Sequence, residues 1–140
     1  MPAASPSQGL VLPDASAWID LIEGNPTWQA RRLRELLDLR LVVVGDLVAM
    51  EVLRGVRDDL RMRRLAKDFE KLPNVLLVEQ GTALRAAHHY RYLRSLGITV
   101  RSTVDCLIAT YRIDHQLPLL HADRDFDAFR DHLGLIVVDA

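Results

Sequence analysis

The sequence lacks the features that mark secreted, membrane and polycationic proteins. Its 140 residues include 1 cysteine, Cys106, which excludes an internal disulfide and a zinc site built on several thiolates, and fits the reducing cytoplasm. No apolar run approaches the roughly 20 residues that span a bilayer, so no membrane association is expected. The formal net charge of −1 counts against nonspecific nucleic-acid binding by the molecule as a whole.

What remains describes one globular domain. The chain is 49% hydrophobic and 26% charged, a composition and length typical of a single soluble domain with a sizeable core. Residues 1–9 are small and uncharged and have no signal-peptide pattern, so they are expected to be a disordered lead-in. The domain is expected to occupy residues 10–140.

Short apolar runs alternate with segments of helical periodicity along this domain. The runs predict strands at 9–13, 41–44, 75–78, 118–120 and 135–138. Helices are predicted at 15–24, 27–40, 46–55, 58–72, 80–96, from 103 onward, and at 126–133. This alternation predicts an α/β fold in which a central parallel sheet of about five strands has helices on both faces.

Acidic residues stand where the predicted strands end and the helices begin. They are Asp14, Glu51, Asp105 and the pair Asp123 and Asp125. Taken singly, each aspartate is equally well explained as a helix cap or a first-turn charge. Glu51 is different, because it lies in the middle of a helix among apolar neighbours, which indicates a carboxylate facing a cleft.

Taken together, the acids are expected to meet at the carboxyl edge of the sheet, where α/β proteins bind ligands. Carboxylates crowded at one place repel one another and have raised pKa values unless a cation neutralises them. An oxygen-only cluster suits hard divalent cations such as Mg²⁺ or Mn²⁺. The leading hypothesis is therefore metal-dependent phosphate chemistry.

Arginine far outnumbers lysine and is concentrated in three segments, 31–40, 54–64 and 85–101. Planar guanidinium groups suit bidentate contact with phosphate. Exposed helix faces with acidic partners explain the same residues. Both interpretations stay open.

The acidic motifs, in their order, resemble those of PIN-domain ribonucleases, most closely the VapC toxins of bacterial type II toxin–antitoxin modules. The resemblance covers the chain from about Gly9 and rests on residues 11–19 (VLPDASAWI), 49–55 (AMEVLRG), 104–109 (VDCLIA) and 121–127 (HADRDFD). It implies a Mg²⁺-dependent endoribonuclease, with Mn²⁺ able to substitute, that restricts growth when free. It also implies a VapB-type antitoxin as partner, a homodimer, and RNA as substrate, with transfer RNA expected first.

The resemblance assigns roles to particular residues. Asp14, Glu51, Asp105 and Asp123 match the catalytic and metal-binding quartet, with Asp125 as the other candidate for the fourth acid and a further metal ligand. Ser16 matches a small hydroxyl residue that orients a carboxylate, and Ser102 or Thr103 is expected to do similar work.

Other function classes fit less well. Haloacid dehalogenase-like phosphatases need a second aspartate where this chain has Ser16, and a response-regulator receiver needs a lysine after the last strand, where this chain has Asp139 and Ala140. No P-loop motif is present. The alternative from a different class is a PIN fold that binds RNA or protein without cutting.

Overall fold

The strands of the protein are very short and all pair in parallel. The computed structural model describes residues 9–140, so the predicted lead-in lies outside the described residues except for Gly9. The strands are β1 (Leu12–Pro13), β2 (Val44–Gly45), β3 (Asn74–Val75) and β4 (Leu119–Leu120). β1 pairs with β4, and β2 pairs with β3.

Two parallel bridges join these pairs into one array. Val11 pairs with Val42, and Leu119 pairs with Val137. The spatial order is therefore β3, β2, β1, β4 and then the segment around Val137. The predicted parallel α/β fold is confirmed, with fewer regular strands than expected, since the predicted strand 135–138 pairs through a single bridge. The strands are short because helices follow at once: Asp14 caps the helix after β1, and Gly45 immediately precedes the helix after β2.

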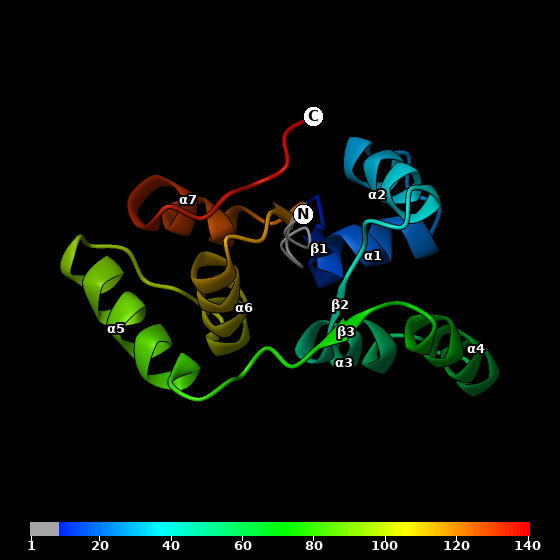
Figure 1. Cartoon of the computed structure of the whole chain (residues 1–140), viewed down its shortest axis with the longest axis horizontal. Helices are drawn as coiled ribbons and strands as arrows, with labels where there is room; N and C mark the ends of the chain where they lie inside the picture. The colour runs from blue at the N-terminus through cyan, green and yellow to red at the C-terminus, as the bar shows by residue number, and fades with distance from the viewer. Residues whose placement is uncertain (1–8) are drawn as a thin grey trace, which may run out of the picture.

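Helices cover the strands on both sides (Figure 1). In order they are α1 (Ala15–Ile22), α2 (Trp28–Asp38), α3 (Asp46–Arg54), α4 (Asp59–Glu70), α5 (Thr82–Ser95), α6 (Thr103–His115), the 3-10 helix η1 (Arg124–Phe126) and α7 (Asp127–Leu133). α1 packs on α2 and α3, and α5 packs on α6 and α7. Within residues 9–140 no helix combines the length and apolar character needed to cross a membrane.

The core lies along the strands and the helix faces that cover them. Leu12, Val44, Leu119 and Ile108 are 1% exposed or less, and burying a side chain of this size contributes roughly 1.5–3 kcal/mol. This packing holds the ends of β1 and β4 rigidly beside the start of α6. Those ends position the acids. A single domain over 10–140 stays a prediction.

Gly45, at the end of β2, offers a test of this packing. A Cβ atom there would lie 2.6 Å from Leu77 Cδ1 and 2.9 Å from Leu77 Cγ, and Leu77 is itself fully buried. Gly45→Ala should therefore lower the free energy of unfolding by about 1–3 kcal/mol, the usual cost of overpacking. Urea denaturation followed by circular dichroism measures it.

Gly55→Ala is the matched control. At Gly55 the nearest atom to an added Cβ is the Val52 carbonyl oxygen at 3.6 Å, and the backbone φ of −89° suits any residue. This variant should be as stable as the wild type or slightly more so. Equal stability of the two variants would show that Gly45 is not tightly packed.

Candidate metal centre

Asp14 lies at the end of β1 and is 4% exposed. Its backbone N–H donates to the Leu120 carbonyl at 3.0 Å, which fixes it beside the end of β4. Its carboxylate Oδ1 accepts from the Ala17 N–H at 3.1 Å and from the Ser16 hydroxyl at 2.6 Å. Asp14 is thus both the N-cap of α1 and a buried carboxylate at the sheet edge. The interpretation of Asp14 as a helix cap is therefore compatible with its interpretation as a residue of the site.

Ser16 joins the two segments that supply Asp14 and Asp123. Its Oγ donates to Asp14 and accepts from the Ala122 N–H at 2.9 Å. The hydroxyl therefore fixes the orientation of the Asp14 carboxylate relative to the loop after β4. This is the geometry expected of a residue that orients a carboxylate.

Asp105, Asp123 and Asp125 form the tightest group of carboxylates. Their ligand atoms lie within 4.8 Å of one another, and all three residues are half-buried. Asp105 lies in the first turn of α6, where its backbone N–H donates to Oγ of the N-cap residue Ser102 at 3.2 Å. Asp123 caps η1 through the Asp125 N–H at 2.9 Å. Both candidates for the fourth acid therefore reach Asp105.

Asp123 is the more central of the two. Its negative charge raises the pKa of Asp14, of Glu51 and of Asp105, whereas Asp125 acts on Asp105 alone among these three. The Asp123 N–H also donates to His121 Nδ1 at 3.2 Å. Burial of the imidazole lowers the pKa of His121.

Glu51 reaches the same cluster from α3. Burial raises its pKa, the charge of Arg54 lowers it, and the charge of Asp123 raises it. Its Oε1 atom is buried and has no hydrogen-bond partner among the described residues. A buried carboxylate oxygen without a donor is costly. A cation bound beside Glu51 would satisfy this oxygen.

The electrostatics of the cluster fit a divalent cation. Burial is the largest cause that raises the pKa of Asp14 to about 6 and the pKa of Asp105 to about 7. For Asp105 the next causes are the charges of Asp123, Glu51, Asp14 and Asp125. Asp105, Asp123 and Asp125 offer carboxylate oxygens close together, and Asp14 and Glu51 lie near enough for their charges to act on Asp105. An oxygen-only set of this kind suits a hard cation.

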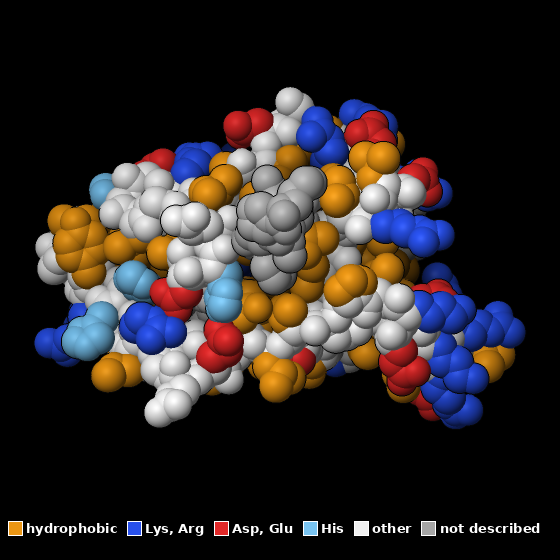
Figure 2. Space-filling model, viewed as in Figure 1, with side chains coloured by type: hydrophobic (Ala, Val, Ile, Leu, Met, Phe, Trp, Pro, Cys, Tyr) orange, Lys and Arg blue, Asp and Glu red, His pale blue; other side chains and the backbone are white. Residues whose placement is uncertain are grey.

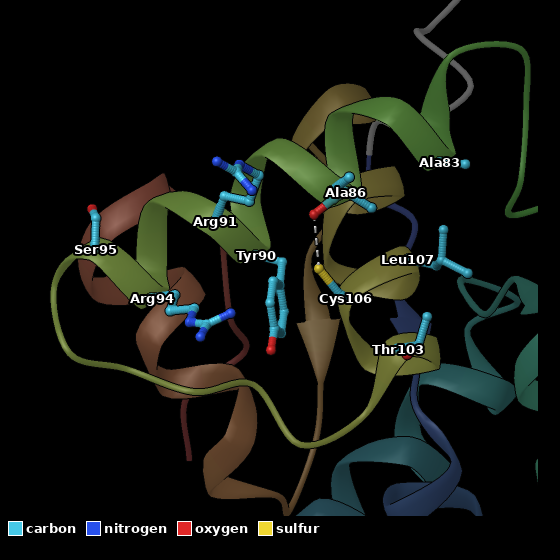
Figure 3. A pocket seen from close by; sticks show the side chains of 10 residues that line it. Ala83, Ala86, Tyr90, Arg91, Arg94, Ser95, Thr103, Cys106 and Leu107 are labelled. Atoms are coloured by element: carbon cyan, nitrogen blue, oxygen red, sulfur yellow. Dashed lines mark hydrogen bonds between the residues drawn. The ribbon is translucent and has the colours of Figure 1, made fainter.

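The five predicted acids and Ser16 therefore converge, but Thr103 lies elsewhere. Ser102 makes the capping bond to Asp105, whereas Thr103 lines a cleft of about 730 Å³ between α5 and α6 (Figure 3). Tyr90, Arg94 and Cys106 line the same cleft, and none of the five acids does. Successive helical residues point about 100° apart, so Thr103 and Asp105 face different sides of α6.

Sequence reasoning missed Arg112. This residue of α6 is 1% exposed, and its charge acts on the Asp14 carboxylate. Burial lowers its pKa to about 9. The available signal was its position seven residues, or two helical turns, after Asp105 in an otherwise apolar stretch.

The raised pKa values predict a pH dependence of stability in metal-free protein. Between pH about 4 and 7, folded Asp14 and Asp105 retain protons that the unfolded chain releases, since their ordinary pKa is 3.8. These groups therefore lower the free energy of unfolding as pH rises through that window. Asp105→Asn should remove the part of this pH dependence that is due to Asp105, so the variant should become more stable than the wild type as the pH rises towards 7.

Urea unfolding at pH 4, 5, 6 and 7 with chelator present measures this difference. The control is Asp38→Asn, an exposed carboxylate at the end of α2, which should leave the pH dependence unchanged. A constant stability difference between Asp105→Asn and the wild type across this range would contradict the raised pKa.

Comparisons with known proteins identify the family of the chain. The family model for the PIN domain matches residues 11–131. The chain is 34% identical over 120 residues to VapC ribonuclease Mb1587 of Mycobacterium bovis, covering 84% of this chain and 90% of that protein. Ribonuclease VapC11 of Mycobacterium tuberculosis matches with the same identity and coverage.

Solved structures share the fold. The VapBC2 complex of Rickettsia felis, bound to a DNA fragment from its promoter, aligns with a TM-score of 0.71 at 15% identity over 94% of this chain and 98% of that one. A toxin–antitoxin complex from Klebsiella pneumoniae aligns with a TM-score of 0.65 at 20% identity, covering 92% and 96%. The chain belongs to the PIN-domain family and, within it, groups with the VapC ribonucleases.

Proposed function

We propose that this protein is a metal-dependent endoribonuclease and the toxin of a toxin–antitoxin pair, and that it restricts growth when free. The observation that carries the proposal is the convergence of Asp14, Glu51, Asp105 and Asp123 at one sheet edge. The identity with proteins named VapC ribonucleases supports the choice of RNA. An intact set of acids argues against a non-catalytic binding module.

The residues of the site divide the work by position. Asp14, Asp105, Asp123 and Asp125 would hold a Mg²⁺ ion, or Mn²⁺ in its place, with Glu51 beside them. Ser16 keeps the Asp14 carboxylate turned towards the loop after β4. When bound, the cation activates water and neutralises charge on the phosphate oxygens. The acids would fix the position of the ion and so the place where a phosphate could bind beside it.

A basic surface over α4 is the region that we propose for contact with the RNA backbone. Lys and Arg side chains gather over α4, at the lower right of the space-filling view (Figure 2). Arg57, Arg61 and Arg64 line two neighbouring clefts between α1, α3 and α4. Guanidinium groups bind phosphate bidentately. Transfer RNA is the substrate we expect first, on the family resemblance.

A VapB-type antitoxin is the proposed protein partner. The cleft beside α4 has an apolar floor that includes Ile19, Ile22 and Val52, with Arg57 and Arg61 at its edge. Such a surface suits an amphipathic segment that carries acidic side chains. A basic side chain from the same partner would neutralise the acidic cluster in place of the cation. Addition of the antitoxin should therefore stop cleavage.

A homodimer in the cytoplasm completes the proposal. Three large apolar side chains are exposed in one stretch of chain between β3 and the first turn of α5: Leu76 is 72% exposed, Val78 46% and Leu84 65%. Exposed apolar side chains that recur in one place indicate a contact surface. The scarcity of cysteine fits a reducing compartment.

Removal of single acids tests the nuclease proposal. Asp14→Asn and Asp105→Asn should each lower the rate of RNA cleavage at least about 100-fold, since each removes charge and an oxygen ligand. Asp123→Asn should cost more than Asp125→Asn, because Asp123 acts on three of the other acids. Cleavage of a mixed RNA substrate with Mg²⁺, resolved on denaturing gels, measures these rates.

The exposed Asp38→Asn, at the end of α2 and away from the proposed RNA surface, is a control for nonspecific charge effects and should keep full activity. Chelation should stop the wild type, and Mg²⁺ or Mn²⁺ should restore it. Cleavage that persists in both Asp14→Asn and Asp105→Asn would overturn the assignment of these acids.

A charge in the proposed contact surface tests the homodimer. Leu76→Asp should give a monomer by light scattering at concentrations where the wild type is a dimer, because a buried unpaired carboxylate is costly at an interface. Leu39→Asp places the same charge at a side chain 66% exposed at the end of α2 and should remain dimeric. A dimeric Leu76→Asp would remove this surface from the proposal.

A further inference from the structure

Arg112 is an unusual residue for the interior of so small a protein. Its side chain is 1% exposed, and among the described residues its Nε and Nη2 atoms have no hydrogen-bond partner. Its Nη1 atom donates to the Leu12 carbonyl and, at 3.2 Å, to the Pro118 carbonyl. Neither acceptor is a carboxylate, so the guanidinium is buried without a salt bridge. Such burial is costly for folding.

The two carbonyls belong to the segments that lead into the metal centre. Leu12 precedes Asp14 by two residues in β1, and Pro118 directly precedes β4, whose end leads to Asp123. The Leu12 N–H donates to the same Pro118 carbonyl at 3.1 Å. The guanidinium therefore adds a second hydrogen-bonded link between β1 and the start of β4.

Arg112 itself lies on α6, the third segment that supplies an acid to the metal centre. It lies two helical turns after Asp105 on α6, so the two residues share one face of that helix. One side chain thus contacts β1 and the start of β4 from the helix that supplies Asp105. Its charge acts on the Asp14 carboxylate as well.

We propose that Arg112 is a positioning residue of the metal centre, which holds the ends of β1 and β4 at the spacing at which Asp14, Asp105 and Asp123 share one cation. This rests on the proposed cation site. It differs from a purely structural role in a measurable way, because replacing a buried charge by an apolar side chain of similar volume often leaves stability unchanged or raises it.

The experiment compares Arg112→Met and Arg112→Lys in the full chain. Mn²⁺ binding is followed by the loss of the free-ion electron paramagnetic resonance signal, and folding by the melting temperature without metal. Arg112→Met should melt within a few degrees of the wild type but bind Mn²⁺ about 10-fold more weakly or worse, the usual range for residues that support metal ligands. Arg112→Lys, which keeps a donor and the charge, should recover part of that affinity.

Thr110→Val is the matched control on the same helix. Thr110 is fully buried, and its hydroxyl donates to the Cys106 carbonyl at 2.7 Å within α6. This variant should bind Mn²⁺ as the wild type does. In RNA cleavage, Arg112→Met should lower kcat about 10-fold with KM within about twofold of the wild type, because the acids lose alignment rather than the RNA surface.

Two results would overturn the proposal. One is wild-type Mn²⁺ affinity in Arg112→Met. The other is weak binding that accompanies a large fall in melting temperature and is not restored by lysine, which would make Arg112 structural only. If the wild type binds Mn²⁺ but cleaves no RNA, the nuclease proposal fails, while the positioning role stands or falls on the Mn²⁺ affinities alone.

Discussion

Mutual repulsion among carboxylates is the constraint on which this structure depends. Asp105 is half-buried beside the charges of four other acids, whereas the positive charges of Arg112 and Arg54 act on Asp14 and Glu51. The fold withstands this because strong apolar packing fixes the strand ends from which the acids project. The core thus supplies the stability that the site takes away, an arrangement found at many functional sites.

The sequence predicted the architecture well because local signals agree with the tertiary fold. The alternation of short apolar runs with helical segments predicted the parallel pairing. Helices also begin at the residues whose side chains suit an N-cap, which are Asp14, Thr27, Asp58 and Ser102. The strand lengths were overestimated, since the runs at 41–44 and 135–138 are apolar for burial as much as for pairing. The pattern of apolar residues shows which side chains are buried, and it predicts the hydrogen bonds between strands only in part.

The site was predictable to the level of the acids and not to the level of their supports. Asp14 and Asp105 stand at a strand end and a helix start, and Glu51 was marked by its place among apolar residues in the middle of a helix, so topology brings the three together. The choice between Ser102 and Thr103 depended on which hydroxyl faces Asp105, a detail of cap geometry. Arg112 stayed hidden because its partners are main-chain carbonyls far away in the sequence. Every residue has a main-chain carbonyl, so the sequence does not show which carbonyls accept a hydrogen bond from a buried side chain.

The Ser16 hydroxyl accepts from the Ala122 N–H across a separation of 106 residues, and the pairing of β1 with β4, which fixes Asp14 beside Leu120, requires residues 119–120. During synthesis the first acid therefore waits for almost the whole chain to leave the ribosome before it meets the last. A nascent chain carries no complete metal centre until its final helices emerge. For a protein that acts on RNA, this order of assembly separates the place of synthesis from the onset of activity, and it gives a partner time to arrive.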